Sequence, residues 1–117
     1  PLWLREAGSW SLSELAAQPD YGLTSLDYHD GQVYVLERFW RSDIGTLIRI
    51  LRFAVDALGS GERIEPELLG TLEAGKTVDN FEGISVTERD DRTVLLIMSD
   101  DNYNEAQRTL ILAFQLD

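Results

Sequence analysis

The sequence has no cysteine and only one histidine, and each shortage removes a class of function. Without cysteine the chain forms no disulfide and carries no thiolate nucleophile or thiolate metal ligand. With His29 as the only histidine, one chain cannot build a zinc site from several imidazoles. Disulfide scaffolds, thiol enzymes and histidine-rich zinc centres are therefore excluded.

Basic residues and long apolar runs are also scarce. The 10 Lys and Arg stand against 21 Asp and Glu, which gives a formal net charge of −11. This balance argues against a nucleic-acid phosphate backbone as partner, and it suits a cation ligand or serves solubility alone. No apolar run approaches the roughly 20 residues of a membrane-spanning helix, so no membrane span is expected.

The 117 residues suffice for one small domain, and a hydrophobic share of 44% is typical of a globular chain. The chain begins at Pro1 without a methionine and without a visible signal peptide. We therefore expect a processed product or a fragment of a longer protein.

Most of the chain predicts β-strands. The segments 22–29 and 32–40 flank an Asp-Gly turn signal, and 82–88, 93–99 and 109–116 are three further strands. The apolar run 93–99 predicts a strand that is buried on both faces. Pro66 restricts the segment 63–73 to a sheet edge.

Two segments remain ambiguous by periodicity. The segment 46–58 fits neither the helical nor the strand period cleanly. The segment 1–19 predicts two short strands, although Ser11 and Glu14 have the spacing of a helix capping box.

An internal repeat favours strand for the first of these segments. The motif "LRFAVD", which begins at Leu51, matches "LAFQLD", which begins at Leu112, and the same offset places Val33 on Val94. Such a period indicates one supersecondary unit per repeat. Each unit has the strand pattern of a four-stranded antiparallel meander, which is the shape of a β-propeller blade.

The predicted fold is all-β and β-propeller-like, with about two four-stranded blades. We expect residues 1–19 to form outer strands of a preceding blade, 20–75 a blade, and 76–117 an incomplete last blade. A propeller needs about 4–8 blades to close its ring. The chain is therefore expected to be part of a longer chain or to assemble as a homo-oligomer.

Two acidic, amide-rich loops are expected to meet at one end of the second unit, because antiparallel order brings "VDNFEG" and "SDDNYNEAQR" together. Hard cations such as Ca²⁺ take carboxylate and amide oxygens as ligands. The candidate metal ligands are Asp79, Asn80, Glu82, Asp100, Asp101 and Asn102. Two alternatives remain open, namely turn stabilisation by hydrogen bonds to the local backbone and direct catalysis.

Three further residues are candidate substrate contacts. Arg38, beside Glu37 at the predicted end of a strand, offers a planar fork for a phosphate or carboxylate, and Arg108 has a similar place in the second unit. The favoured alternative is an ion pair of each arginine with the acidic loops. Trp40 either packs between blades or stacks on a ligand. Glu82 is expected to be buried and hydrogen-bonded, with Arg108 as one candidate donor.

The motifs "TVDNFEGISV" and "LIMSDDNYNEAQRTLILAFQLD" closely resemble the C-terminal part of the phytase esterase-like family. The upstream "YGLTSLDYHDGQVYVLERFW" is similar to the preceding blade of that family. The family comprises bacterial β-propeller proteins with esterase-like activity of phytase, and the resemblance implies a periplasmic or secreted location. It also implies hydrolysis of a phosphorylated or ester small molecule.

The resemblance suggests a cation-assisted hydrolysis in which bound Ca²⁺ polarises the phosphoryl oxygen and activates water. Glu82 and Arg38 are then the candidate catalytic residues, and Arg38, Arg108 and Trp40 hold the substrate. The competing hypothesis is a non-enzymatic propeller that serves as a binding scaffold, because one fold supports many functions.

Overall fold

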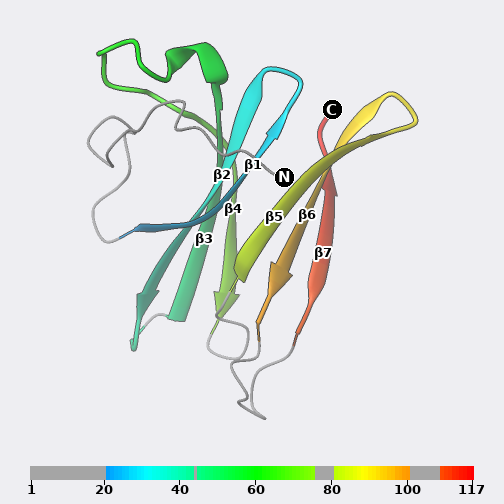
Figure 1. The fold of residues 1–117 in the computed structure, drawn as a ribbon. Coiled ribbons are helices and arrows are strands. Elements are labelled where there is room, and N and C mark those ends of the chain that lie inside the picture. Colours follow the sequence, from blue (N-terminus) through cyan, green and yellow to red (C-terminus); the bar gives the residue numbers. More distant parts are fainter. Residues whose placement is uncertain (1–20, 44, 76–80, 101–108) are drawn as a thin grey trace, which may run out of the picture.

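The computed structural model describes residues 21–43, 45–75, 81–100 and 109–117. These residues form two antiparallel sheets, which stand side by side in Figure 1. No helix in the described ranges is long and apolar enough to cross a membrane.

Sheet 1 contains four strands in sequence order. Its first two strands are joined by a tight turn, in which Asp30 and Gly31 have φ values of 49° and 78°. Asp-Gly tolerates these left-handed conformations, and the turn matches the twist of the strands. The strands are β1 (Gly22–His29), β2 (Gln32–Arg41), β3 (Gly45–Ala54) and β4 (Glu67–Gly75).

Sheet 2 contains three strands, again in sequence order. The turn between the first two holds Asp90 and Asp91, with φ values of 52° and 61°. The strands are β5 (Phe81–Arg89), β6 (Arg92–Ser99) and β7 (Ile111–Gln115).

The ambiguous segment 46–58 is mainly strand, as the repeat argument predicts. Strand β3 runs to Ala54, and the short 3-10 helix η1 (Val55–Ala57) follows it. The segment that Pro66 restricts becomes β4, which lies at the edge of sheet 1 as expected. The predicted strands of residues 1–19 lie outside the described residues.

The main core lies between the two sheets. Alternate residues of β2 and β3 face alternate residues of β5 and β6, so each strand buries one side against the other sheet. The buried members are Tyr34, Leu36, Ile48, Ile50, Phe81, Ile84, Val86, Leu95 and Ile97.

Side chains of β1 join the two sheets along one seam. Asp27 Oδ2 accepts a hydrogen bond from the amide of Val86 at 2.6 Å, and Ser25 Oγ accepts one from the amide of Ile84 at 3.3 Å. These bonds supply partners for the backbone of β5, which has β6 on its other side. The first strands of the two sheets therefore run side by side in the same direction.

The outer faces of the two sheets differ. On sheet 1, a second core of Val33, Val35, Leu51 and Phe53 is buried together with Ile64 from the connection after β3. On sheet 2, Met98 and Ile111 are 49% and 67% exposed. We call this the open face of sheet 2, formed by Val94, Leu96, Met98, Ile111, Ala113 and Gln115.

The open face corrects one prediction. The sequence predicts that the apolar run 93–99 is buried on both faces, yet only Leu95, Ile97 and Ser99 are buried. The opposite side of β6 remains half-buried or exposed, because no described element packs on it.

The prediction of an all-β, propeller-like fold with about two blades is confirmed. One sheet has four strands, the other has three, and both are antiparallel.

Candidate functional site

The described strand ends meet as the antiparallel order predicts. Gly22 at the start of β1 lies opposite Arg38, and Phe81 at the start of β5 lies opposite Ser99. Thr24 Oγ1 donates to the carbonyl of Phe81 at 3.3 Å, which brings the two starts together. We call this end of the two sheets the entry end.

Two of the six predicted metal ligands are described, and both lie at the entry end. Glu82 and Asp100 directly follow the paired residues Phe81 and Ser99. Both are exposed. The other four, Asp79, Asn80, Asp101 and Asn102, lie outside the described residues. Within the described ranges no group of three or more His, Asp and Glu side chains is placed to hold a metal.

The exposure of Glu82 corrects the expectation that it is buried. The register between β5 and β6 shifts between Phe81 and Gly83, and the buried positions of β5 are Phe81, Ile84 and Val86. Glu82 falls inside this irregularity and points to solvent. A carboxylate in water needs no protein donor, so the predicted network around Glu82 is not required.

The described residues on either side of positions 101–108 are nevertheless hydrogen-bonded to each other. The amide of Ser99 donates to the carbonyl of Leu110 at 2.9 Å, and the amide of Leu110 donates to Ser99 Oγ at 2.9 Å. Ser99 is buried. Asp100 therefore directly follows a strand end that is fixed by two hydrogen bonds.

Arg38 and Trp40 lie on the same face of β2. Side chains alternate along a strand, so both share the side of Leu36, which packs toward sheet 2. Arg38 is half-buried and forms no ion pair with a described residue, and Trp40 is 54% exposed. Trp40 lies within β2, which continues one residue beyond the predicted strand 32–40 to Arg41. Arg108 lies outside the described residues.

Glu37 and Arg38 do not act as a pair, because they point to opposite faces of β2. Glu37 is fully buried at 0% exposure on the outer side of sheet 1. Its nearest described charge is Arg49, whose Nη1 lies 3.8 Å from Oε2. Neither carboxylate oxygen has a hydrogen-bond partner in the described structure.

Aromatic rings complete the surroundings of Glu37. The guanidinium of Arg49 lies over the ring of Tyr21 at 5.2 Å, and that ring is 5.5 Å from the ring of Phe39. Burial raises the pKa of Glu37, and the charge of Arg49 only partly opposes this. Sequence reasoning misses this buried carboxylate, because the pattern places Glu37 at the end of a strand rather than within it.

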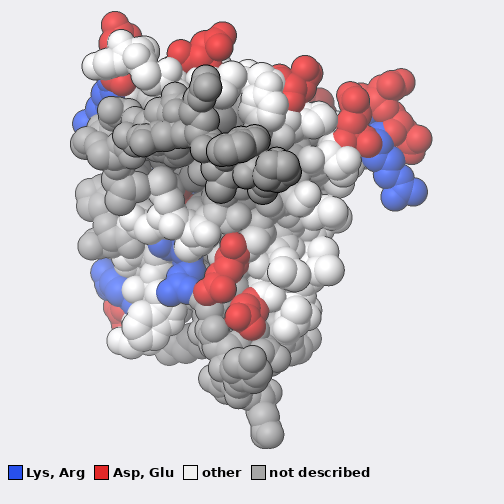
Figure 2. Space-filling model, in the orientation of Figure 1, with Lys and Arg blue, Asp and Glu red and all other residues white. Residues whose placement is uncertain are grey.

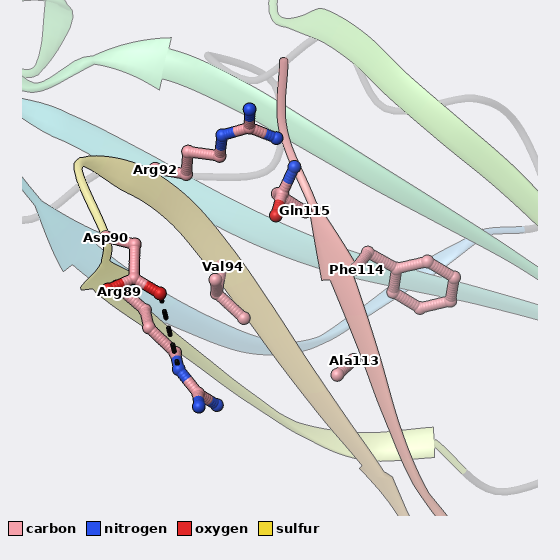
Figure 3. A pocket seen from close by; sticks show the side chains of 7 residues that line it. All are labelled: Arg89, Asp90, Arg92, Val94, Ala113, Phe114 and Gln115. Atoms are coloured by element: carbon pink, nitrogen blue, oxygen red, sulfur yellow. Dashed lines mark ion pairs between the residues drawn. The ribbon is translucent and has the colours of Figure 1, made fainter.

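A shallow groove of about 580 Å³ lies at the opposite end, beside the β5–β6 turn. In Figure 3, Val94 lies on one side of β7, and the ring of Phe114 points to the other side of this strand. Arg89 and Asp90 are 4.0 Å apart at the rim. The lining residues are Arg89, Asp90, Arg92, Val94, Ala113, Phe114 and Gln115.

Acidic side chains are not confined to the entry end. Figure 2 shows them along the upper end of the molecule, where the β1–β2 and β5–β6 turns lie, and a smaller group beside basic side chains lower down. Negative charge alone therefore does not mark one end as a cation site. The place of a cation site therefore has to be inferred from the types of the side chains and from the strand ends at which they lie.

A family model described as Phytase-like, esterase-like activity of phytase, matches residues 4–103. This range spans most of both sheets and includes the entry end. No curated protein and no solved structure matches the chain significantly.

Proposed function

Because the chain belongs to the Phytase-like family, described by the esterase-like activity of phytase, we propose that it is part of a propeller that hydrolyses phosphoester or ester bonds. The single observation that carries this proposal is the family match over residues 4–103. The entry end is the part of the described fold that best suits the chemistry.

The donor types at the entry end fit a hard cation. Glu82 and Asp100 are carboxylates that leave adjacent strands at the same level, and Ca²⁺ prefers such oxygen ligands. We propose that Asp79, Asn80, Asp101 and Asn102 complete the ligand set from the neighbouring loops. A bound cation would supply Lewis acidity toward a phosphoryl or carbonyl oxygen.

Arg38 is the residue that we propose for substrate binding. It lies on the inner face of β2 at the entry end, and no described carboxylate neutralises it. A guanidinium can hold two oxygens of a phosphate in parallel hydrogen bonds. Trp40 shares its face and offers an exposed ring for an apolar part of the substrate. Arg108, which lies outside the described residues, is the third residue that we propose for this role.

Calcium binding can be tested on the chain itself. A ligand that binds only the folded state stabilises it by mass action, so millimolar Ca²⁺ should raise the melting temperature. The double variant Asp100→Asn with Asp101→Asn should lose this rise. Asp56→Asn, an exposed carboxylate in η1, is the matched control and should keep it. Equal rises in all three proteins would contradict the site.

Catalysis requires a separate assay. Pooled phosphoester and carboxyl-ester substrates should be hydrolysed by the chain, or by a longer family member, in the presence of Ca²⁺. Glu82→Gln and Arg38→Ala should each lower turnover about a hundredfold, the scale of one catalytic group. Arg63→Ala, an exposed arginine away from the entry end, should leave turnover unchanged. Calcium binding without any turnover would favour the scaffold hypothesis instead.

A further inference from the structure

Strand β7 lies at the edge of sheet 2, because β6 is the only strand that pairs with it among residues 21–43, 45–75, 81–100 and 109–117. The amide of Leu116 donates to the carbonyl of Thr93, and the carbonyl of Leu110 accepts from the amide of Ser99. Even-numbered residues therefore point their backbone groups toward β6, and odd-numbered residues point theirs away. The residues of β7 whose backbone groups point away from β6 are Ile111, Ala113 and Gln115, and all three are exposed.

Strand β4, the edge of sheet 1, is protected and β7 is not. Two glutamates, Glu67 and Glu73, lie on β4, and its pairing with β3 contains two register shifts. Charges and bulges of this kind discourage pairing with another chain. The five residues of β7 carry no charge, and their register with β6 is regular.

A cavity of about 190 Å³ opens between the two outermost strands, β4 and β7. A fourth strand beside β7 would turn its inward side chains toward this space. The lining is largely apolar and consists of Ile50, Leu69, Gly70, Thr71, Leu72, Leu95, Phe114, Gln115 and Leu116. The inward residues of such a strand should therefore be large and apolar.

We propose that β7 pairs antiparallel with β7 of a second copy of this chain. The two three-stranded sheets then form one six-stranded sheet about a two-fold axis. An axis perpendicular to the sheet keeps Leu112 and Phe114 of each copy on the side of the cavity. Strand β7 of the second copy thus turns large apolar side chains toward the cavity, as its apolar lining requires.

Charge selects β7 rather than β4 for this contact. In a pairing centred on Ala113, Ile111 lies opposite Gln115 and Thr109 lies opposite Asp117, so no like charges meet. The same pairing of β4, centred on Gly70, would place Glu67 opposite Glu73. Like charges directly opposite each other destabilise a strand pair.

Self-association should be measured by sedimentation equilibrium on the 117-residue chain. We expect a monomer–dimer equilibrium that strengthens with salt, because each copy carries a formal charge of −11. Ala113→Pro removes an amide that β6 does not use, and Ile111→Lys adds a charge to the edge of sheet 2. Each should weaken association about tenfold or more. Leu68→Lys, which replaces a side chain 49% exposed on β4, is the control and should not.

A cysteine can locate the contact, because the chain has no cysteine of its own. Ala113→Cys should form a disulfide-linked dimer on oxidation, since paired residues lie about 5.5 Å apart, within the range that a disulfide spans. Ala54→Cys, an exposed position in β3, should not. A parent that stays monomeric up to about 100 μM, or a dimer that survives both Ala113→Pro and Ile111→Lys, would overturn the proposal.

Discussion

Glu37 is a buried carboxylate whose only described counter-charge, on Arg49, is too distant for a hydrogen bond. Taking a carboxylate out of water costs free energy unless hydrogen bonds compensate. Burial accordingly raises its pKa above the ordinary value. The folded chain therefore binds this proton more tightly than the unfolded chain does.

The raised pKa predicts how stability depends on pH. The free energy of unfolding should be highest below the ordinary glutamate pKa and should fall as pH rises from about 4 through the raised pKa. Each unit of pKa increase removes about 1.4 kcal/mol at neutral pH. Urea unfolding at a series of pH values should show this loss, and Glu37→Gln should abolish it.

Glu88→Gln is the matched control, because Glu88 is exposed. It should leave the pH profile of the parent unchanged. A Glu37→Gln profile that still falls over the same range would show that another group is responsible.

Glu82 illustrates the opposite situation, because its side chain is exposed at the entry end. We expect Glu82→Ala to change the free energy of unfolding by less than about 0.5 kcal/mol, as is usual for surface positions. Urea denaturation measures this. A loss of about 2 kcal/mol or more would mean that Glu82 is part of a buried network after all.

The sequence predicts residue types at the candidate site better than it predicts their exposure. Glu82 lies at the start of one strand that periodicity identifies and Asp100 follows the end of the next, so their place at one end could be derived. The exposure of Glu82 depends on a register shift, which leaves no trace in composition. The metal-binding and substrate-binding roles stay predictions.

At the scale of elements, the seam between β1 and β5 is held by side chains rather than by a backbone ladder. Asp27→Ala removes the acceptor of the Val86 amide, which lies 2.6 Å from Oδ2. Hydrogen bonds to charged groups contribute about 1.5–3 kcal/mol, so we expect a loss of that size. Amide exchange at Val86 should accelerate with it.

Two variants delimit this prediction. Asp27→Asn keeps an acceptor and should lose less stability than Asp27→Ala. Ser85→Ala, at an exposed position of β5, should have no effect. If Ser85→Ala accelerates exchange at Val86 as much as Asp27→Ala does, the seam is not specific to Asp27.

Strands were largely predictable because their signals are local. Asp-Gly marks the β1–β2 turn, "RDDR" marks the β5–β6 turn, and Pro66 precedes an edge strand. The end of β3 at Ala54 was not predictable, because η1 begins where the chain contacts Gly31 through the amide of Val55. That contact depends on tertiary structure.

At the scale of the whole molecule, the two sheets share one core and should unfold together. Leu95 of β6 packs in the same cluster as Leu36 and Ile48 of sheet 1. Leu95→Ala should cost about 2–5 kcal/mol, as buried leucine truncations do. Hydrogen exchange should show loss of protection in both sheets. Loss confined to β5–β7 would contradict a shared core.

The repeat shows where sequence reasoning stops at this scale. The two turns are bounded by the equivalent pairs His29–Gln32 and Arg89–Arg92, so the structure aligns Val33 with Thr93. The sequence match aligns Val33 with Val94 instead, which is out of step by a single position. A shift of this size moves a side chain to the other face of a sheet. Short matches between apolar strands do not resolve this difference.

Because β1 and β5 run in the same direction, the two sheets are arranged head to tail rather than face to face. A rotation, without reversal of strand direction, carries the first hairpin onto the second, so the pair has a front and a back. The front of sheet 1 is covered by sheet 2, and the equivalent front of sheet 2 is its open face. An operation of this kind repeats until its angle closes a circle, whereas a two-fold contact at β7 terminates after two copies. Packing on the open face of sheet 2 would thus repeat from unit to unit, whereas the proposed pairing at β7 would end with two copies.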